Sequence, residues 1–473
     1  MNSRWNALMV LCVGMLMIIL DATVVNVALP SIQDELHFTQ AGLAWVVNAY
    51  LIAFAGLLLL AGRLGDLLSR RGVFLAGLIV FTAASLACGL ADSRALLIAA
   101  RFVQGVGGAL TSAVILGMIV TMFTEPRERA KAIGVYSFVA SAGGSVGLLA
   151  GGVLTEAVNW HWIFFINVPI GIATGIAAVK LLPNDKGIGL RAGTDVLGAA
   201  LITAALMLGV YSVVQPHGRL WTIISVVLLA LFVVREATAR SPLVPLRVFR
   251  SYPVTSANVI QILAVAGMFG MFFLGVLYLR EVLGYDALRS GAAFLPVTLV
   301  MGTLSLRYSE PLLTRFGPRR LIVVGLGLAA LGLALFARVP VHGAYLTDVL
   351  PSMLLIGTGM GIAVPGLATL AMSTATDADA GLASGLVNTT AQIGSALGVA
   401  VLATLSANRT ASLLADGADR AVALSGGYRL ALLTGTALVV LALAVATTLL
   451  RTRKPQPAPA QPPAELLALS AVD

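Results

Sequence analysis

Asp21 is the residue with the most informative chemistry, because it lies inside an otherwise apolar run from Trp5 to Leu29. A carboxylate in the hydrocarbon of a bilayer costs roughly 2.5–3.5 kcal/mol on insertion scales, so it usually faces a protein interior or a wet cavity. Such a group can exchange a proton as its access alternates between the two sides of a membrane. The alternative is a structural hydrogen bond to a neighbouring helix. We favour proton coupling.

Arg101 lies inside another apolar run, near 95–123, and offers a cation that could pair with Asp21. Gln104 follows one turn later, and small glycines around it would let helices pack closely. We predict that Arg101 is the counter-charge that sets the proton affinity of the site. The alternative is an arginine near the membrane surface that extends its head group into water.

The elements that hold these residues are predicted to be membrane-spanning helices. The chain has 473 residues, of which 59% are hydrophobic and 11% charged, a composition typical of all-α polytopic membrane proteins. A helix needs about 20 apolar residues to cross the hydrocarbon core. Fourteen such runs lie near 5–29, 43–62, 73–91, 95–123, 132–155, 162–182, 195–214, 220–235, 255–279, 290–309, 320–338, 348–371, 381–407 and 428–450.

The distribution of basic residues predicts the orientation. Twenty-one of the thirty Lys and Arg residues lie on the side of the N-terminus, eight lie on the other side, and Arg101 is within a helix. Because loops rich in Lys and Arg stay in the cytoplasm, we expect a multi-pass protein of the cell (plasma) membrane with both termini cytoplasmic.

A weak internal repeat predicts two halves. The segments 62–71 and 311–320 are short loops that each end in paired arginines, and parallel repeats are a known transporter design. We expect a first six-helix half in residues 1–183, two inserted helices in 184–250 and a second six-helix half in 251–451. Residues 452–473 contain repeated prolines and are expected to be a disordered cytoplasmic tail.

Several function classes are disfavoured by the sequence. The basic residues are spread over short loops, which argues against nucleic-acid binding. None of the four lysines follows a glycine, so no P-loop is present. The four histidines are scattered, and no nucleophile, metal or acid–base cluster suggests an enzyme. We expect no cofactor and no bound metal; a proton gradient would supply the energy.

The chain resembles the fourteen-helix drug:proton antiporters of the major facilitator superfamily. The segments that carry this resemblance are 20–30, 62–71, 101–109, 143–152, 160–171 and 380–398. Departures occur at Leu67, Ser69, Leu148 and Ala391, where the family usually has arginine, glycine, proline and arginine. The resemblance implies the major facilitator fold, with two six-helix halves plus two inserted helices, and export of drug-like molecules.

The resemblance also implies roles for residues of the loop near 62–71. In the family, the aspartate matching Asp66 helps to lock the cytoplasmic side closed, and Gly62, Arg70 and Arg71 belong to the same gating motif. A helix predicted to begin near Asp379 would attract this carboxylate through its positive end. The other interpretation of Asp66 is a solvated loop charge.

Other small and polar residues recur at helical spacing. Gly143, Gly147 and Gly151 would allow two helices to approach closely. A second set could line the substrate path or simply join helices by hydrogen bonds: Asn26, Gln104, Asn258, Gln261, Asn388 and Gln392.

The sequence therefore predicts a secondary active exporter of drug-like or antibiotic small molecules, driven by inward proton flow and working as a monomer in the lipid bilayer. One alternative is the same fold exporting a specific physiological solute, such as a self-made antibiotic, a siderophore or an amino acid. Another is a non-transporting membrane scaffold or receptor, which would not need a buried Asp21.

Overall fold

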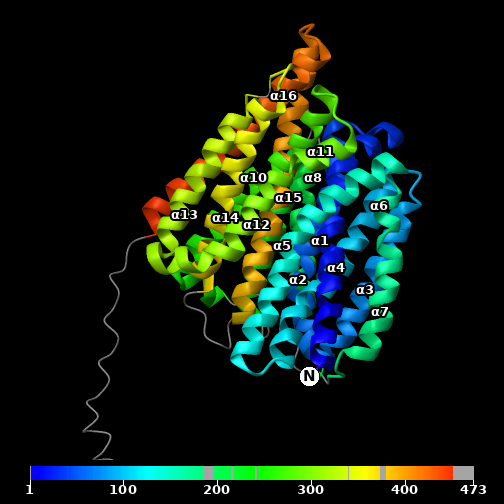
Figure 1. Cartoon of the computed structure of the whole chain (residues 1–473), viewed down its shortest axis with the longest axis vertical. Coiled ribbons are helices and arrows are strands. Elements are labelled where there is room, and N and C mark those ends of the chain that lie inside the picture. The colour runs from blue at the N-terminus through cyan, green and yellow to red at the C-terminus, as the bar shows by residue number, and fades with distance from the viewer. Residues whose placement is uncertain are drawn as a thin grey trace, which may run out of the picture.

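The computed structural model describes residues 2–185, 187, 189, 195–214, 218–239, 242–243, 246–338, 340–372 and 380–450. In this part of the chain every regular element is a helix (Figure 1). The expected proline-rich tail, 452–473, lies outside the described residues.

The first helices of the chain form one group, which we call the N-terminal bundle (α1–α7). Neighbouring members pack on one another, including α3 on α4, α2 on α4, α1 on α5 and α3 on α7. Their bounds are α1 Asn2–Leu36, α2 Gln40–Leu67, α3 Arg70–Gly89, α4 Arg94–Met122, α5 Pro126–Ala157, α6 Trp162–Phe165 and α7 Asn167–Leu181.

The last helices form a second group, the C-terminal bundle (α10–α16), on the other side of the molecule (Figure 1). Their bounds are α10 Tyr252–Leu277, α11 Ala287–Ala293, α12 Leu295–Thr303, α13 Ser309–Phe336, α14 Leu350–Met372, α15 Ala380–Ala415 and α16 Arg420–Leu449. Single π-helical turns at Tyr278–Val282, Leu304–Tyr308 and Tyr345–Val349 extend or join them.

Two further helices, α8 (Val196–Val214) and α9 (Arg219–Thr238), form a pair between the two bundles in the sequence. α8 packs on both α2 and α15, whereas most side chains of α9 are exposed. An apolar exposed face is typical of a helix that contacts lipid.

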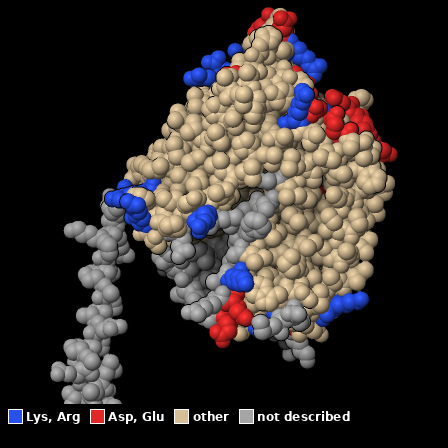
Figure 2. Space-filling view, in the orientation of Figure 1, with Lys and Arg blue, Asp and Glu red and all other residues tan. Residues whose placement is uncertain are grey.

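Twelve helices in the described residues are long and apolar enough to cross a membrane. Two shorter apolar stretches, Val146–Ala157 and Ala287–Thr303, fall where the fifth and tenth spans were expected. The tenth is divided at Phe294, because Pro296, in the first turn of α12, has no backbone N–H to continue the helical hydrogen bonds of α11. The all-helical polytopic fold is confirmed, and the count of fourteen stays a prediction. Figure 2 shows charged side chains gathered toward the ends of the visible face, with a largely uncharged band between them.

Close helix contacts in the N-terminal bundle depend on glycine at the crossing points. A Cβ atom on Gly107 of α4 would lie 2.4 Å from the backbone nitrogen of Phe81 in α3. A Cβ atom on Gly105 would lie 2.4 Å from the carbonyl oxygen of Tyr50 in α2. Since real side chains cannot approach so closely, these glycines allow α4 to pack against two neighbours and to hold Arg101 between them.

Candidate functional site

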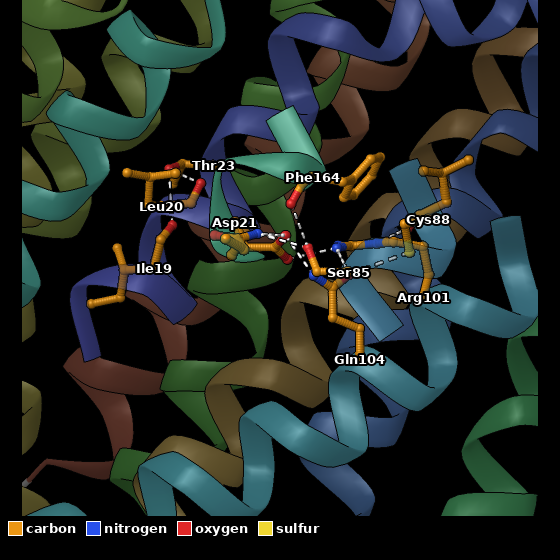
Figure 3. Close-up of polar contacts among 12 residues, drawn as sticks. Ile19, Leu20, Asp21, Thr23, Ser85, Cys88, Arg101, Gln104 and Phe164 are labelled. Atoms are coloured by element: carbon orange, nitrogen blue, oxygen red, sulfur yellow. Dashed lines mark hydrogen bonds and ion pairs between the residues drawn. The ribbon is translucent and has the colours of Figure 1, made fainter. Parts of the chain in front are cut away.

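Asp21 lies at the centre of a buried polar network in the N-terminal bundle (Figure 3). Its Oδ2 atom accepts a hydrogen bond from Nη1 of Arg101 at 2.6 Å. Its Oδ1 atom accepts from Nε2 of Gln104 at 2.7 Å and from Nδ2 of Asn167 at 3.0 Å. Three donors from two other helices therefore converge on one carboxylate that has no exposed surface.

Arg101 is held on all sides by groups that suit a cation. Its Nε atom donates to the carbonyl oxygen of Val46 at 3.0 Å, and Nη1 also donates to Oε1 of Gln104 at 2.7 Å. The guanidinium carbon lies 4.5 Å from the ring centre of Tyr50 and 5.6 Å from that of Phe164. Aromatic faces attract a cation, so Arg101, which is 1% exposed, lies inside the bundle and does not extend to the membrane surface.

A second layer of residues fixes the amides of the network. Asn167, at the first position of α7, also donates to Oγ of Ser85 at 3.0 Å. Ser85 on α3 in turn donates to the carbonyl oxygen of Phe164 at 2.9 Å. Cys88, one turn further along α3, donates through sulfur to Oε1 of Gln104 at 3.6 Å. Helices α1, α2, α3, α4 and α7 therefore all contribute to the site.

Asn167, Ser85 and Tyr50 were not among the residues singled out from the sequence. Asn167 carried a usable signal, because it is an amide inside the predicted apolar run 162–182. Ser85 and Tyr50 are residue types common in any membrane helix, so only the packing of α3 and α2 shows their contacts with the site.

Asn26 does not join this network. Its amide nitrogen donates to the carbonyl oxygen of Ala22 on its own helix at 3.4 Å. The side chain is 8% exposed.

The polar residues proposed for the C-terminal bundle lie on two helices that pack on each other, α10 and α15. Asn258 on α10 donates to its own helix and accepts from Oγ1 of Thr390 on α15 at 2.8 Å. Gln261 is buried, Gln392 is half-buried and Asn388 is exposed. Asn258 thus links two helices, and its partner on α15 is Thr390.

The proposed gating residues do not lie in a loop, as expected, but in two helices: Gly62 and Asp66 are in the last turns of α2, and Arg70 and Arg71 begin α3. Asp66 accepts from Nη2 of Arg70 at 2.8 Å, one turn along the chain, and Arg71 donates to the carbonyl oxygen of Val179 on α7. Gly62 has room around it, since the nearest atom to an added Cβ is 4.0 Å away on Ala113. Asp379, near which the lock was expected, lies outside the described residues.

The three glycines of α5 face α1. A Cβ atom on Gly151 would lie 2.8 Å from the carbonyl oxygen of Val24, and one on Gly147 would lie 3.1 Å from that of Leu20. Gly143 is equally close to Ile19 and Leu16 side chains. The stripe therefore sets the distance between α5 and the helix that carries Asp21.

The two bundles contact each other through α2 and α15, and hydrogen bonds also join them at the end opposite the N-terminus. Nη1 of Arg280, in the C-terminal bundle, donates to the carbonyl oxygen of Val27 at 3.3 Å and to Oγ of Ser31 at 3.2 Å, both on α1. The carboxylate of Glu156 on α5 accepts from the backbone nitrogen of Ala287 at 3.3 Å. Among the described residues, no three His, Cys, Asp or Glu side chains come together as a metal site requires.

Comparisons with known proteins assign the chain to a family. The model of the Major Facilitator Superfamily matches residues 11–399. The chain is 37% identical over 464 residues to the puromycin resistance protein of Streptomyces alboniger, covering 95% of this chain and 92% of that protein. It is 39% identical over 460 residues to the cephamycin export protein of Amycolatopsis lactamdurans, covering 95% of this chain and 93% of that protein.

A solved structure agrees in fold. A bacterial homologue of the human lysosomal transporter Spinster, in an inward-facing and unoccupied conformation, matches with a TM-score of 0.68 at 18% identity. The match covers 95% of this chain and 97% of that one. From the family match and the two relatives together, the chain belongs to the major facilitator superfamily.

Proposed function

We propose that the protein exports drug-like or antibiotic small molecules from the cell and that inward proton flow drives the export. The observation that carries the proposal is the buried Asp21–Arg101 pair in a chain whose relatives are named for antibiotic resistance and export. A buried charged pair is costly to keep in a membrane helix bundle, so a functional role is its best explanation.

Proton uptake at Asp21 would act on the whole site. Ionised Asp21 holds Arg101 and two amides at short range. Protonation removes the negative charge and leaves the Arg101 cation without its counter-ion, which favours a different packing of α1 against α4. The same helix carries Val27 and Ser31, the acceptors of Arg280 across the bundle interface. Val27 is six residues from Asp21, or about 9 Å along a helix, so a shift of α1 would reach this contact.

In the proposal, the N- and C-terminal bundles are the two halves that alternate access, with α8 and α9 as the inserted pair of a fourteen-span protein. In the present conformation, Arg280 and Glu156 join the bundles at one end, and α2 packs on α15. With the basic loops in the cytoplasm, the end of Arg280 and Glu156 faces outward. The protein would then work as a monomer in the plasma membrane, with protons and the substrate as its ligands and no cofactor.

The test is substrate accumulation in a drug-sensitive host, with and without a proton uncoupler. The wild type should lower accumulation, and the uncoupler should abolish this effect. Asp21→Asn keeps the shape of the side chain but cannot exchange a proton, so it should accumulate drug like the empty host. Asp34→Asn is the matched control, because Asp34 is an exposed aspartate on the same helix. Wild-type export by Asp21→Asn at equal abundance would refute the assignment.

A narrower specificity is the second candidate. The two relatives above are named for single antibiotics, puromycin and cephamycin, which favours a dedicated antibiotic exporter over a broad one. A panel of unrelated antibiotics and cationic dyes separates the two, since a dedicated exporter protects against one chemical class only.

A further inference from the structure

The segment that follows α7 folds back onto the turn between α2 and α3. We call its described residues (182–185, 187 and 189) the linker. Asp185 is the centre of this contact. Its Oδ1 atom accepts from the hydroxyl of Ser69 at 2.8 Å and from the backbone nitrogen of Arg71 at 3.2 Å. Its Oδ2 atom accepts from the backbone nitrogen of Arg70 at 2.8 Å. One carboxylate thus binds three donors at the start of α3, where the helix dipole also favours a negative charge.

Backbone hydrogen bonds extend the contact beyond Asp185. The nitrogen of Gly187 donates to the carbonyl oxygen of Leu68 at 2.7 Å, and that of Gly189 donates to the carbonyl oxygen of Leu67 at 2.9 Å. A Cβ atom on Gly187 would lie 2.2 Å from the Leu67 oxygen, and Gly189 has φ of +92°. Both positions therefore require glycine, the first for space and the second for its backbone conformation.

The contact explains a departure from the family pattern. Ser69 stands where glycine is usual, yet its φ of −175° is extended backbone that any residue adopts. The hydroxyl accepts from the backbone nitrogen of Gly72 at 3.1 Å, which caps α3, and donates to Asp185. Serine therefore fits this position because it joins the turn to the linker.

Asp185 remains charged under physiological conditions. Burial acts to raise the pKa of its carboxyl, and the hydrogen bonds from Arg70, Ser69 and Arg71 outweigh this, so the pKa lies below its ordinary value. The contact is then complete above the ordinary range of aspartate, about pH 3.9, and would be lost only in stronger acid.

The helix that follows the linker also packs on the N-terminal bundle. The ring of Tyr211 on α8 lies 6.2 Å from that of Trp45 on α2. At the other end of α8, Ala199 forms a buried cluster with Leu243, Val254 of α10 and Leu386 of α15, and three leucines of α2 pack against this cluster: Leu57, Leu59 and Leu60. α8 thus contacts α2 near both of its ends and also touches the C-terminal bundle, whereas the linker is hydrogen-bonded to the N-terminal bundle.

We propose that Asp185 is a positioning residue for transport: the contacts of Asp185, Gly187 and Gly189 with the α2–α3 turn fix the linker to the N-terminal bundle. The α8–α9 pair then moves with this bundle, and the start of α3 is held in place. Asp185 acts through Arg70. It accepts from the backbone nitrogen of Arg70, and the side chain of Arg70 donates to Asp66. This proposal rests on the transport function proposed above. In it, the contact stays formed throughout the transport cycle, since both partners belong to one moving body.

The test combines two kinds of disruption with a covalent replacement. Asp185→Ala removes the carboxylate, and Gly187→Ala forces the backbone segment away from Leu67. Both should lower the maximal transport rate per molecule in proteoliposomes by roughly tenfold, the order expected when hydrogen bonds to a charged group are lost, without changing the apparent KM. Asn184→Ala is the matched control, because Asn184 is a neighbouring exposed residue of the same linker.

The double variant Ser69→Cys/Asp185→Cys gives the decisive outcome. The pair should form a disulfide on oxidation with copper phenanthroline, scored by loss of maleimide labelling, both with and without substrate and a proton gradient. Oxidation should restore the rate that the reduced double variant loses. An inactive oxidised protein would overturn the proposal, because the contact would then have to open in each cycle. So would unchanged rates in Asp185→Ala and Gly187→Ala, or lower abundance with an unchanged rate per molecule. A disulfide that forms in full while the wild type transports no drug would instead refute the transport function.

Discussion

Replacing Arg101 with methionine should destabilise the protein strongly, because it leaves the Asp21 carboxylate buried without its counter-ion. The variant loses the 2.6 Å ion pair with Asp21 and the contacts with Val46 and Gln104. Removing one partner of a buried pair costs about 3–5 kcal/mol. In a body of 150–250 residues each kcal/mol moves Tm by about 2–4 °C, so we expect Tm to fall by about 6–20 °C.

The unpaired charge of Asp21, and not the lost side-chain volume, causes the expected fall in Tm. The double variant Asp21→Asn/Arg101→Met removes both charges and keeps an amide that Gln104 and Asn167 can still bind. It should recover more than half of the lost Tm while remaining inactive. Lower pH should also reduce the loss in Arg101→Met, because a protonated Asp21 is no longer an unpaired charge.

Thermal unfolding in detergent with a thiol-reactive dye measures these changes directly. The free cysteines Cys12 and Cys88 are both buried, so they react only as the protein unfolds. A Tm of Arg101→Met within about 2 °C of the wild type, or a double variant no more stable than the single one, would refute the reasoning.

Three further predictions test other parts of the account. Gly151→Leu should lower Tm and the yield of folded protein, because even a Cβ atom there would lie 2.8 Å from the carbonyl oxygen of Val24. Gly144→Leu is the control, because nothing lies within 4 Å of a Cβ atom at Gly144, and equal Tm values for the two variants would contradict the packing of α5 on α1. Asn258→Ala should lower the free energy of unfolding by only about 0.6 kcal/mol, the average for a hydrogen bond between membrane helices, and should leave transport intact. Loss of transport with a normal Tm would instead place Asn258 on the substrate path. Deleting residues 455–473 should change neither insertion nor drug resistance, because a proline-rich segment buries little apolar surface; a large loss at normal abundance would indicate that the tail binds a partner.

The central pair could be predicted from the sequence, because a charge in an apolar run is costly wherever the helix packs. Asp21 and Arg101 both stood out on that ground, and the structure brings them together. The surrounding residues could not be found in this way. Whether Ser85 and Asn167 reach Asp21 depends on how α3 and α7 pack on α1, and no spacing within one helix contains that information.

The linker contact shows the same limit. A lone aspartate in a polar loop, such as Asp185, looks like a solvated charge until the loop is seen against α3. The helix count was limited for another reason. Hydropathy marks apolar runs, but Pro296 divides the tenth run into two short helices, so an apolar run does not guarantee one continuous span.

The most direct test of proton coupling at Asp21 is proton movement that depends on substrate. Purified protein in liposomes containing a pH-sensitive dye should move protons when a transported drug is added on one side. Asp21→Asn should bind the drug and show no such proton movement, whereas Asp34→Asn should match the wild type. Proton movement at the wild-type level in Asp21→Asn would contradict the account, because the proton would then have to use another group.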